Sequence, residues 1–203
     1  MMIQTKLDFY KAVKERRSMY GISKETVISD QKIEEIVAFA VKHAPTAFNS
    51  QSGRAVILLG ENHDKLWNIT EAALREIVPA ENFQPTADKM ESFRNGYGTI
   101  LFFEDQSVVK SLQEKFPLYA EKFPEYSLQS SGMLQYIVWT ALEAEGLGAS
   151  LQHYNPIIDE AVQKIWDIPA EWTLVSQMPF GKPTAAAGEK QFISIEERMK
   201  VFK

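Results

Sequence analysis

Cysteine is absent from this 203-residue sequence, and so is any excess of positive charge. Without cysteine the chain has no disulfide, no thiol nucleophile and no thiolate metal ligand, although this absence is compatible with any compartment. The formal net charge is −5, and no run rich in Lys and Arg occurs. Because binding to a phosphate backbone needs a basic surface, we expect no nucleic-acid partner.

Long hydrophobic runs are also missing. The N-terminal stretch MMIQTKLDFYKAVKERR is charged throughout and lacks the apolar centre of a secretory signal. The most apolar run, residues 136–142, is far shorter than the roughly 20 residues that a membrane-spanning helix needs. The sequence therefore predicts a soluble cytoplasmic protein without a membrane partner. Its length and 45% hydrophobic content predict that residues 1–203 form one domain, or a tight two-lobed unit, with a sizeable core.

Catalytic motifs with strong signatures are absent too. The chain has no P-loop, no dinucleotide-binding glycine pattern, no G-x-S-x-G turn and no H-E-x-x-H pair. Its histidines, His43, His63 and His153, lie on separate predicted elements without the spacing of metal ligands. We therefore expect no metal site, and any chemistry would come from a bound organic cofactor.

The sequence does contain one stretch, residues 130–156, around which the rest is organised. Its first half is apolar on every side at helical spacing, which predicts a buried helix. The apolar residues are Met133, Leu134, Tyr136, Ile137, Val138, Trp139, Ala141 and Leu142. Ser130 or Ser131 would cap the first turn, and Gly146 stands where a left-handed C-terminal residue is expected. Residues 149–154 would then leave the core as a short strand.

Two adjacent arginines, Arg16 and Arg17, end a predicted N-terminal helix in which Ile3 and Leu7 recur at helical spacing. One interpretation is a solvated last turn whose positive side chains interact with the negative end of the helix dipole. The other is an anion site, because guanidinium groups beside a hydroxyl, here Ser18, match the shape and charge of a phosphate. These residues alone do not decide between the two.

A loop dense in amides and hydroxyls, residues 45–54, follows a helix predicted to begin at the N-cap Ser29 and to end at Pro45. Asn49 and Gln51 each pair a donor with an acceptor, as recognition of the amide-like edge of a heterocycle requires. Ordinary surface loops are polar as well. The apolar run that follows, residues 55–59, predicts a central strand covered on both faces.

The remaining patterns predict a helix over 66–77, a loop and short helix over 83–95, strands over 98–103 and 172–176, and a helix from Asn155-Pro156 to Trp166. The aromatic segment 115–126 is interrupted by two prolines. It predicts either a lid over a pocket or an irregular outer helix.

The C-terminal residues form an apolar tail. After the turn-prone residues 181–188, Ser194 and Glu197 predict a capping box for a short helix. The tail exposes too much apolar surface to remain in water, so we expect residues 182–203 to pack on a partner subunit. Its apolar side chains are Phe192, Ile193, Ile195, Met199, Val201 and Phe202.

Three stretches together resemble the FMN-dependent nitroreductase family. They are Glu15-Arg16-Arg17-Ser18, the Asn49-Ser50-Gln51 loop before a core strand, and Glu145-Gly146-Leu147-Gly148-Ala149 at the end of the central helix. The variants APTAFNSQSGR, GLGASLQHYNP and MPFGKP are similar to the branch that includes yeast fatty-acid-repression nitroreductases and bacterial copper-induced nitroreductases. The resemblance covers essentially the whole chain.

The resemblance implies an α+β fold: a three-layer α/β/α sandwich with a mainly antiparallel sheet, in an intertwined homodimer whose C-terminal tails are exchanged. It also implies FMN as the cofactor, NAD(P)H as the electron donor, and nitroaromatics or quinones as substrates reduced by ping-pong hydride transfer. No side chain would be catalytic, because flavin N5 is the reactive centre.

For the phosphate, the resemblance points to the N-terminal arginines. Arg16 and Arg17 would hold the phosphate and ribityl side together with Ser18. Lys190 would be a further phosphate ligand, although Lys182 is an alternative for that role.

For the flavin ring, the resemblance points to two other segments. Asn49 and Gln51 would face the ring from the partner subunit. The exit strand would lie along the isoalloxazine, with a backbone N–H near N5; its residues are Leu151, Gln152, His153 and Tyr154.

The sequence departs from the common family pattern at two places. Tyr20 stands where many members have a basic residue, and Ser52-Gly53 stands where many have Pro-Trp. These departures concern substrate preference rather than FMN binding. A flavin-binding redox sensor, in which catalysis is incidental, is therefore the alternative hypothesis to an oxidoreductase.

Overall fold

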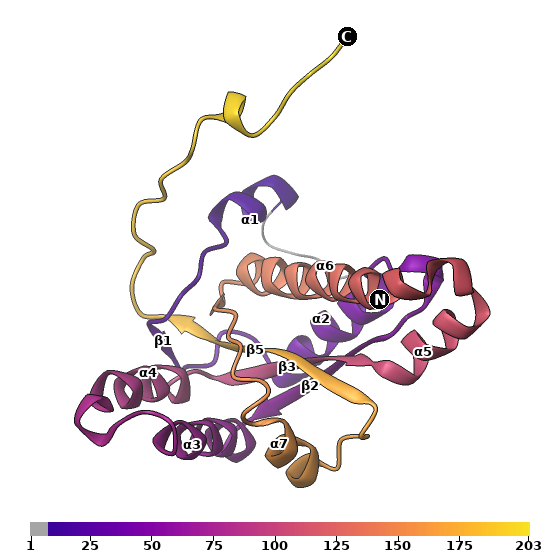
Figure 1. Ribbon diagram of the computed structural model, residues 1–203. Helices are drawn as coiled ribbons and strands as arrows, with labels where there is room; N and C mark the ends of the chain where they lie inside the picture. Colours follow the sequence, from indigo (N-terminus) through magenta and orange to yellow (C-terminus); the bar gives the residue numbers. More distant parts are fainter. Residues whose placement is uncertain (1–7) are drawn as a thin grey trace.

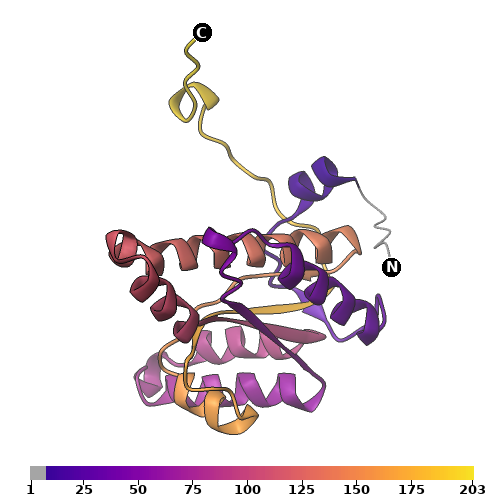
Figure 2. The same ribbon diagram turned by 90° about the vertical axis from the view of Figure 1, so that its right-hand side faces the viewer.

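A computed structural model describes residues 8–203 and shows an antiparallel sheet between two layers of helices (Figures 1 and 2). The strand order is β1-β5-β3-β2, and β4 pairs with β5. The strands are β1 (Ile22–Ser23), β2 (Gly53–Leu59), β3 (Gly98–Asp105), β4 (Gly148–Ala149) and β5 (Trp172–Pro183). All these strand pairs are antiparallel, which confirms the expected α+β sandwich with an antiparallel sheet.

Strand β3 lies at the centre of the core, and all of its residues are buried. Because side chains alternate along a strand, it supplies apolar groups to both faces of the sheet. Ile100 and Phe102 belong to the cluster on one face. Leu101 and Phe103 belong to the cluster on the other. Its continuous apolar sequence is thus explained by a helical layer on each side.

The first helical layer consists of α2 (Asp30–His43) and α6 (Phe123–Ala144), which lie over one face of the sheet (Figure 1). Their buried apolar residues form one cluster with that face, including Ile36, Val138 and Leu142. The second layer consists of α3 (Glu61–Arg75), α4 (Gln84–Arg94) and α7 (Asp159–Trp166). Trp67, Phe93 and Val162 are buried in its cluster.

Shorter elements connect the layers. They are α1 (Phe9–Glu15), α5 (Gln106–Lys115), and the 3-10 turns η1 (Ala47–Asn49), η2 (Ala80–Asn82), η3 (Pro117–Lys122) and η4 (Ile195–Glu197). After β5 the chain leaves the sheet, and the exposed tail runs away from the body of the protein (Figure 2). Across residues 8–203, no helix combines the length and hydropathy needed to cross a membrane.

Several boundaries agree with the sequence. Ser29 caps α2, with its hydroxyl accepting a hydrogen bond from the Lys32 amide at 3.2 Å. Gly146, just beyond α6, has a φ of +86° as expected of a left-handed cap residue. Ile3 and Leu7, which contributed to the predicted N-terminal helix, lie outside the described residues; helix α1 begins at Phe9, after the N-cap Asp8.

The predicted start of the central helix was wrong. Helix α6 begins at Phe123, and Ser130 and Ser131 are buried inside it instead of capping it. The Ser130 hydroxyl donates to the Tyr126 carbonyl one turn earlier, at 2.9 Å. Pro124 lies in the first turn, where its missing N–H costs nothing. The 115–126 segment is thus an irregular helical approach to α6.

One other predicted helix start was wrong, and one predicted capping box does not form. Helix α7 begins at Asp159, because residues 155–158 form a turn. Near the C-terminus, Ser194 makes no capping hydrogen bond to the backbone, and its hydroxyl contacts Glu196 rather than Glu197. The terminal helix is therefore only the single turn η4.

A buried polar network links β3 to α3. The Trp67 indole N–H donates to the Thr99 hydroxyl at 3.0 Å, and that hydroxyl lies 2.9 Å from His63 Nδ1. His63 Nε2 lies 3.3 Å from the Arg94 carbonyl, which can only accept. The imidazole is therefore neutral with its proton on Nε2, and burial lowers the pKa of His63 to about 4.

We expect this histidine to make the protein less stable in acid. Because its pKa is lowered in the folded state, the unfolded chain takes up a proton first as the pH falls from about 6.5 to about 4. Relative to His63→Gln, which stays neutral, the wild type should lose about 3 kcal/mol of unfolding free energy between pH 7 and pH 4. Urea titrations at fixed protein concentration measure this, and parallel pH profiles for the two proteins would contradict it.

Candidate functional site

The arginine segment and the exit strand lie side by side in the structure. Ser18 forms an isolated parallel bridge with Ala149 of β4, and the Met19 amide donates to the Ala149 carbonyl at 2.9 Å. Strand β4 in turn pairs with β5 through Ala149 and Phe180. Two stretches more than 120 residues apart in sequence are therefore held next to each other at one end of the sheet.

The two arginines carry charges that no described carboxylate neutralises through an ion pair. The Arg16 guanidinium carbon lies 4.3 Å from the ring centroid of Trp139, and its buried Nε has no hydrogen-bond partner among the described residues. Arg17 donates from Nη1 to the Gly188 carbonyl at 2.7 Å. Such unneutralised guanidinium groups are suited to hold an anion.

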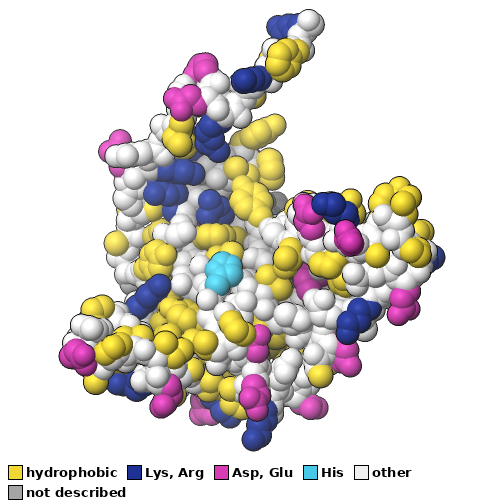
Figure 3. Space-filling model, in the orientation of Figure 1, with side chains coloured by type: hydrophobic (Ala, Val, Ile, Leu, Met, Phe, Trp, Pro, Cys, Tyr) yellow, Lys and Arg dark blue, Asp and Glu magenta, His cyan; other side chains and the backbone are white. Residues whose placement is uncertain are grey.

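Figure 3 shows the face of the molecule from which the C-terminal tail departs. Lys and Arg side chains gather where the tail leaves the body, beside exposed hydrophobic side chains. A ligand with a charged end and an apolar ring would match this combination of groups.

The even-numbered residues of the exit strand form hydrogen bonds with β5. The amide and carbonyl of Gln152 pair with those of Gln177 at 2.7 and 2.9 Å, and the Tyr154 amide donates to Gln177 Oε1 at 2.8 Å. The amides of Leu151 and His153 form no hydrogen bond with any described residue. Their alternation places them on the edge that faces away from β5, so they are free to donate to a ligand.

The side chains of the exit strand point to different surroundings. Leu151 packs on the α2/α6 cluster, whereas Tyr154 packs in the other layer, edge-on to Trp67 at 5.9 Å between ring centroids. Burial raises the pKa of Tyr154 to about 12, so its hydroxyl stays protonated at neutral pH. His153 is exposed, and the side chain of Gln152 donates to the Ser150 hydroxyl at 3.0 Å.

Gln177 was not among the residues predicted from the sequence. Its side chain is fully buried and bonds the Tyr154 amide, so it fixes the direction of the exit strand. The available signal was a single amide side chain in the mostly apolar stretch TLVSQMPF.

The Asn49–Gln51 loop lies elsewhere in the same chain. Together with the end of α2 it borders a cavity of about 350 Å³, which Ser130 and Leu134 of α6 also line. Arg16, by contrast, stacks on Trp139 of the same helix. From Ser130 to Trp139 the helix advances roughly 13 Å. One chain therefore does not bring the loop and the arginines together.

The two candidate lysines differ in their surroundings. Lys182 forms an ion pair with Glu25 at the β1 edge of the sheet. Lys190 lies on the exposed tail, two residues beyond the Gly188 that Arg17 holds, and its Nζ is 5.3 Å from the Phe192 ring. Lys190 is thus the more available of the two for an anion near Arg17.

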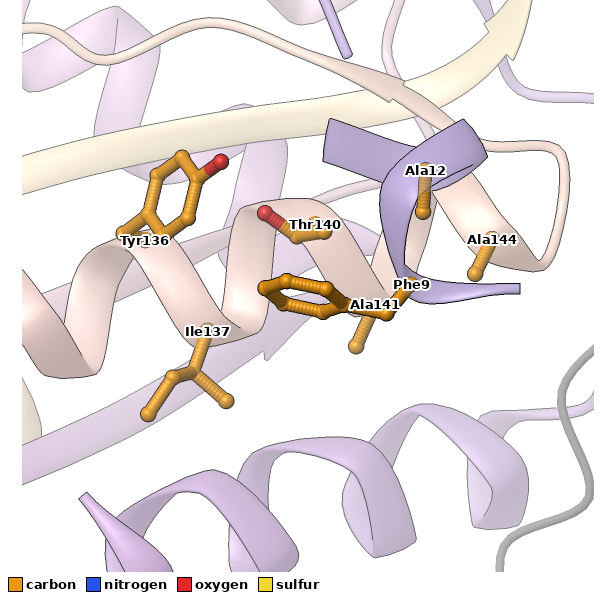
Figure 4. Close-up of a pocket in the computed structure, with 7 residues that line it drawn as sticks. All are labelled: Phe9, Ala12, Tyr136, Ile137, Thr140, Ala141 and Ala144. Atoms are coloured by element: carbon orange, nitrogen blue, oxygen red, sulfur yellow. The ribbon is translucent and has the colours of Figure 1, made fainter. Parts of the chain in front are cut away.

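An apolar groove of about 240 Å³ runs between α1 and α6 (Figure 4). Phe9 and Ala12 of α1 lie across it from α6. The α6 residues that line it are Tyr136, Ile137, Thr140, Ala141 and Ala144. The buried helix predicted from the sequence is thus partly uncovered, and Met133 and Tyr136 are about 40% exposed in the single chain.

Comparison with known proteins decides the family: the sequence model of the nitroreductase family matches residues 13–182. The chain belongs to the nitroreductase family. Two Saccharomyces cerevisiae proteins carry that family name as well. The chain is 40% identical to nitroreductase HBN1 over 187 residues, 91% of this chain and 93% of HBN1. It is 37% identical to nitroreductase FRM2 over 193 residues, 92% of this chain and 94% of FRM2.

A solved structure of this family has the same fold. It is the structure of nitroreductase CinD from Lactococcus lactis in complex with chloramphenicol. CinD is 47% identical to this chain and superposes on it with a TM-score of 0.89; the match covers 97% of this chain and 100% of that chain. The resemblance read from the sequence is therefore confirmed, including its yeast and bacterial branch. As a member of this family, the protein falls in the oxidoreductase class.

Proposed function

We propose that this protein is an FMN-dependent NAD(P)H oxidoreductase that reduces nitroaromatics or quinones, and that it works as a homodimer. The observation that carries the proposal is the unneutralised Arg16–Arg17 pair, held against a strand whose Leu151 and His153 amides are free. A phosphorylated flavin needs both features: cations at its phosphate and donors along its ring.

The residues would divide the work as follows. Arg16, Arg17 and Ser18 would hold the phosphate and ribityl side, with Lys190 as a further cation. The backbone of the exit strand, which includes Gln152 and Tyr154, would donate to the ring and hold it in place. FMN, when bound, supplies the hydride chemistry at N5. The protein contributes binding, orientation and exclusion of water, so no side-chain acid or base is assigned.

Similar proteins support the cofactor and the substrate class. A nitroreductase from Exiguobacterium sibiricum that was solved in complex with FMN has the same fold. It superposes with a TM-score of 0.71 at 17% identity, and the match covers 99% of this chain and 100% of that chain. CinD was solved with chloramphenicol and, in another structure, with 4-nitrophenol, and both ligands are nitroaromatic. The similarity to CinD extends the same class of ligand to this chain.

Three features favour the homodimer. Asn49 and Gln51 lie too far along α6 to join the arginines of their own chain, so a second copy would supply them. The groove between α1 and α6 leaves apolar surface for a partner. The tail, residues 182–203, would cross to that partner, and we expect residues 1–203 to form one domain. We expect the enzyme to act in the cytoplasm, where NAD(P)H is supplied.

Freshly purified protein tests this function. We expect the two visible absorption bands of a bound flavin, and turnover of a nitroaromatic such as chloramphenicol with NADH or NADPH at the order of 1–10 s⁻¹, a typical enzyme rate. Bound flavin without appreciable turnover would favour the redox sensor instead. Protein that stays colourless when FMN is offered in excess would contradict both.

A further inference from the structure

A carboxylate is buried beneath the loop that carries Asn49 and Gln51. Glu104, near the end of β3, is only 1% exposed. Its Oε2 accepts hydrogen bonds from the hydroxyls of Ser52 and Ser127, each at 2.6 Å. Ser52 directly follows Gln51, and Ser127 belongs to α6. Glu104 therefore ties the loop to both the sheet and the central helix.

The loop needs such a support because its backbone is strained. Phe48, Asn49 and Gln51 have φ values of 56°, 51° and 52°, in the left-handed region that side-chain-bearing residues disfavour. Left-handed residues persist only where the surrounding structure holds them. Without contacts at its base, the loop would relax and turn its amide side chains elsewhere.

Other contacts hold the two ends of the loop. The Gln51 amide donates to the Thr46 hydroxyl at 3.1 Å, and Arg54 donates to the Gln51 carbonyl at 2.6 Å. Arg54 also pairs with Asp105 at 2.9 Å. The side chain of Phe48 packs on aromatic residues before and within α6. Ser52 is joined to β3 twice: its carbonyl accepts a hydrogen bond from the Asp105 amide at 3.0 Å, and its side chain bonds Glu104.

We propose that Glu104 is a positioning residue, which holds the strained 46–52 loop so that Asn49 and Gln51 present their amides to the flavin ring of the partner subunit. This inference rests on the proposed function for the identity of the ring. The hold on the loop is a property of the single chain and can be tested separately.

The surroundings of Glu104 separate this role from that of an ordinary core residue. Its second oxygen, Oε1, is buried without a hydrogen-bond partner among the described residues, next to the 350 Å³ cavity that Gln51 lines. Burial raises the pKa of Glu104, which favours the neutral acid. A neutral amide of the same shape can accept both serine hydroxyls, so glutamine should replace glutamate in this role.

The test compares Glu104→Leu, which removes the acceptor at similar volume, with Glu104→Gln, which keeps it. For apo protein titrated with FMN, we expect the leucine variant to raise the Kd at least tenfold and the glutamine variant to stay within threefold of wild type. Hydrogen exchange of the Gln51 amide in the apo protein should speed up at least tenfold in the leucine variant alone. Equal FMN affinity and equal exchange in all three proteins would overturn the proposal.

Thr99→Val is the matched control. Thr99 is a fully buried polar residue at the other end of β3, where its hydroxyl bonds Trp67 and His63 instead of the loop. This variant should lower stability yet leave the FMN Kd within twofold and the Gln51 exchange unchanged. If it weakens FMN as much as Glu104→Leu does, Glu104 acts only through general stability and the proposal is wrong.

A further variant tests the proposal if the Glu104→Leu protein fails to fold. Ser52→Ala removes only the side-chain link from the loop to Glu104; the backbone bond to the Asp105 amide and the bond between Ser127 and Glu104 remain. This variant should raise the Kd and the Gln51 exchange at least threefold. Should the wild type bind no FMN, the proposed function fails. The exchange measurement then still decides whether Glu104 holds the loop.

Discussion

Replacing Arg16 and Arg17 together by alanine is expected to yield colourless protein with FMN affinity lowered about 10²-fold to 10⁴-fold. Each guanidinium group would make charge-assisted hydrogen bonds worth about 1.5–3 kcal/mol, so losing both removes roughly 3–6 kcal/mol of binding free energy. Neither side chain has a carboxylate partner among residues 8–203. The substitution therefore breaks no described ion pair, although burial raises the pKa of the half-buried Glu143 and the substitution removes the Arg16 charge that counteracts this rise.

The measurement is the flavin content of the purified variant, followed by titration of the apo protein with FMN. Circular dichroism checks the fold, because Arg16 also covers Trp139. Arg75→Ala serves as the control: Arg75 is an exposed arginine on α3, in the opposite helical layer, and its ion pair with Glu71 is superficial. Full flavin occupancy in the double variant would refute the assignment of the arginines to the phosphate.

Deleting residues 189–203 is expected to convert the protein from a dimer to a monomer and to abolish flavin retention. The tail exposes side chains such as Phe192 at 75% and Phe202 at 90%, which is unfavourable unless a partner covers them. A stable interface buries about 1,200–2,000 Å² in total, and an extended segment crossing to a second subunit would supply much of that area. Each site would then lose the loop of the other subunit.

Sedimentation or light scattering measures the oligomeric state, and the visible spectrum measures the flavin. Ile77→Ser is the control, because Ile77 is an apolar residue 61% exposed just beyond α3, away from the tail. It should leave both the dimer and the flavin unchanged. A truncated protein that remains dimeric and fully yellow would refute the role of the tail.

Much of the fold could be predicted because local patterns and packing agree. The apolar run after Gly98 formed the buried strand expected, and Ser29 capped its helix. The run before Leu59 also formed a strand, but the prediction that it is central and covered on both faces was wrong, because β2 lies at the edge of the sheet and is mostly half-buried. The start of α6 could not be predicted, because a proline is equally compatible with the interruption of a helix and with its first turn. Only packing against the rest of the protein decided that Pro124 begins a helix.

Motifs in the sequence pointed to the parts of the proposed site, but not to the residues that support them. Motif resemblance pointed to Arg16 and the exit strand, and the structure brought them together. Gln177 and Glu104 were missed because each acts through residues distant in sequence, and no local pattern reports such a contact. Glu104 in the sequence FFED resembles an ordinary polar end of a strand.

The length of strand β3 also sets the distance between the two parts of the proposed site. At its Gly98 end it lies opposite Phe180, beside the strand that adjoins the arginines, and at its other end Glu104 supports the amide loop. Gly98 and Glu104 are six residue steps apart, which at about 3.4 Å per residue separates these two positions by roughly 20 Å along the sheet. In a twofold dimer, each of the two sites would combine the arginines of one copy with the loop of the other, so the same distance would have to be met at both sites. The length of one strand therefore constrains how a symmetric pair can assemble.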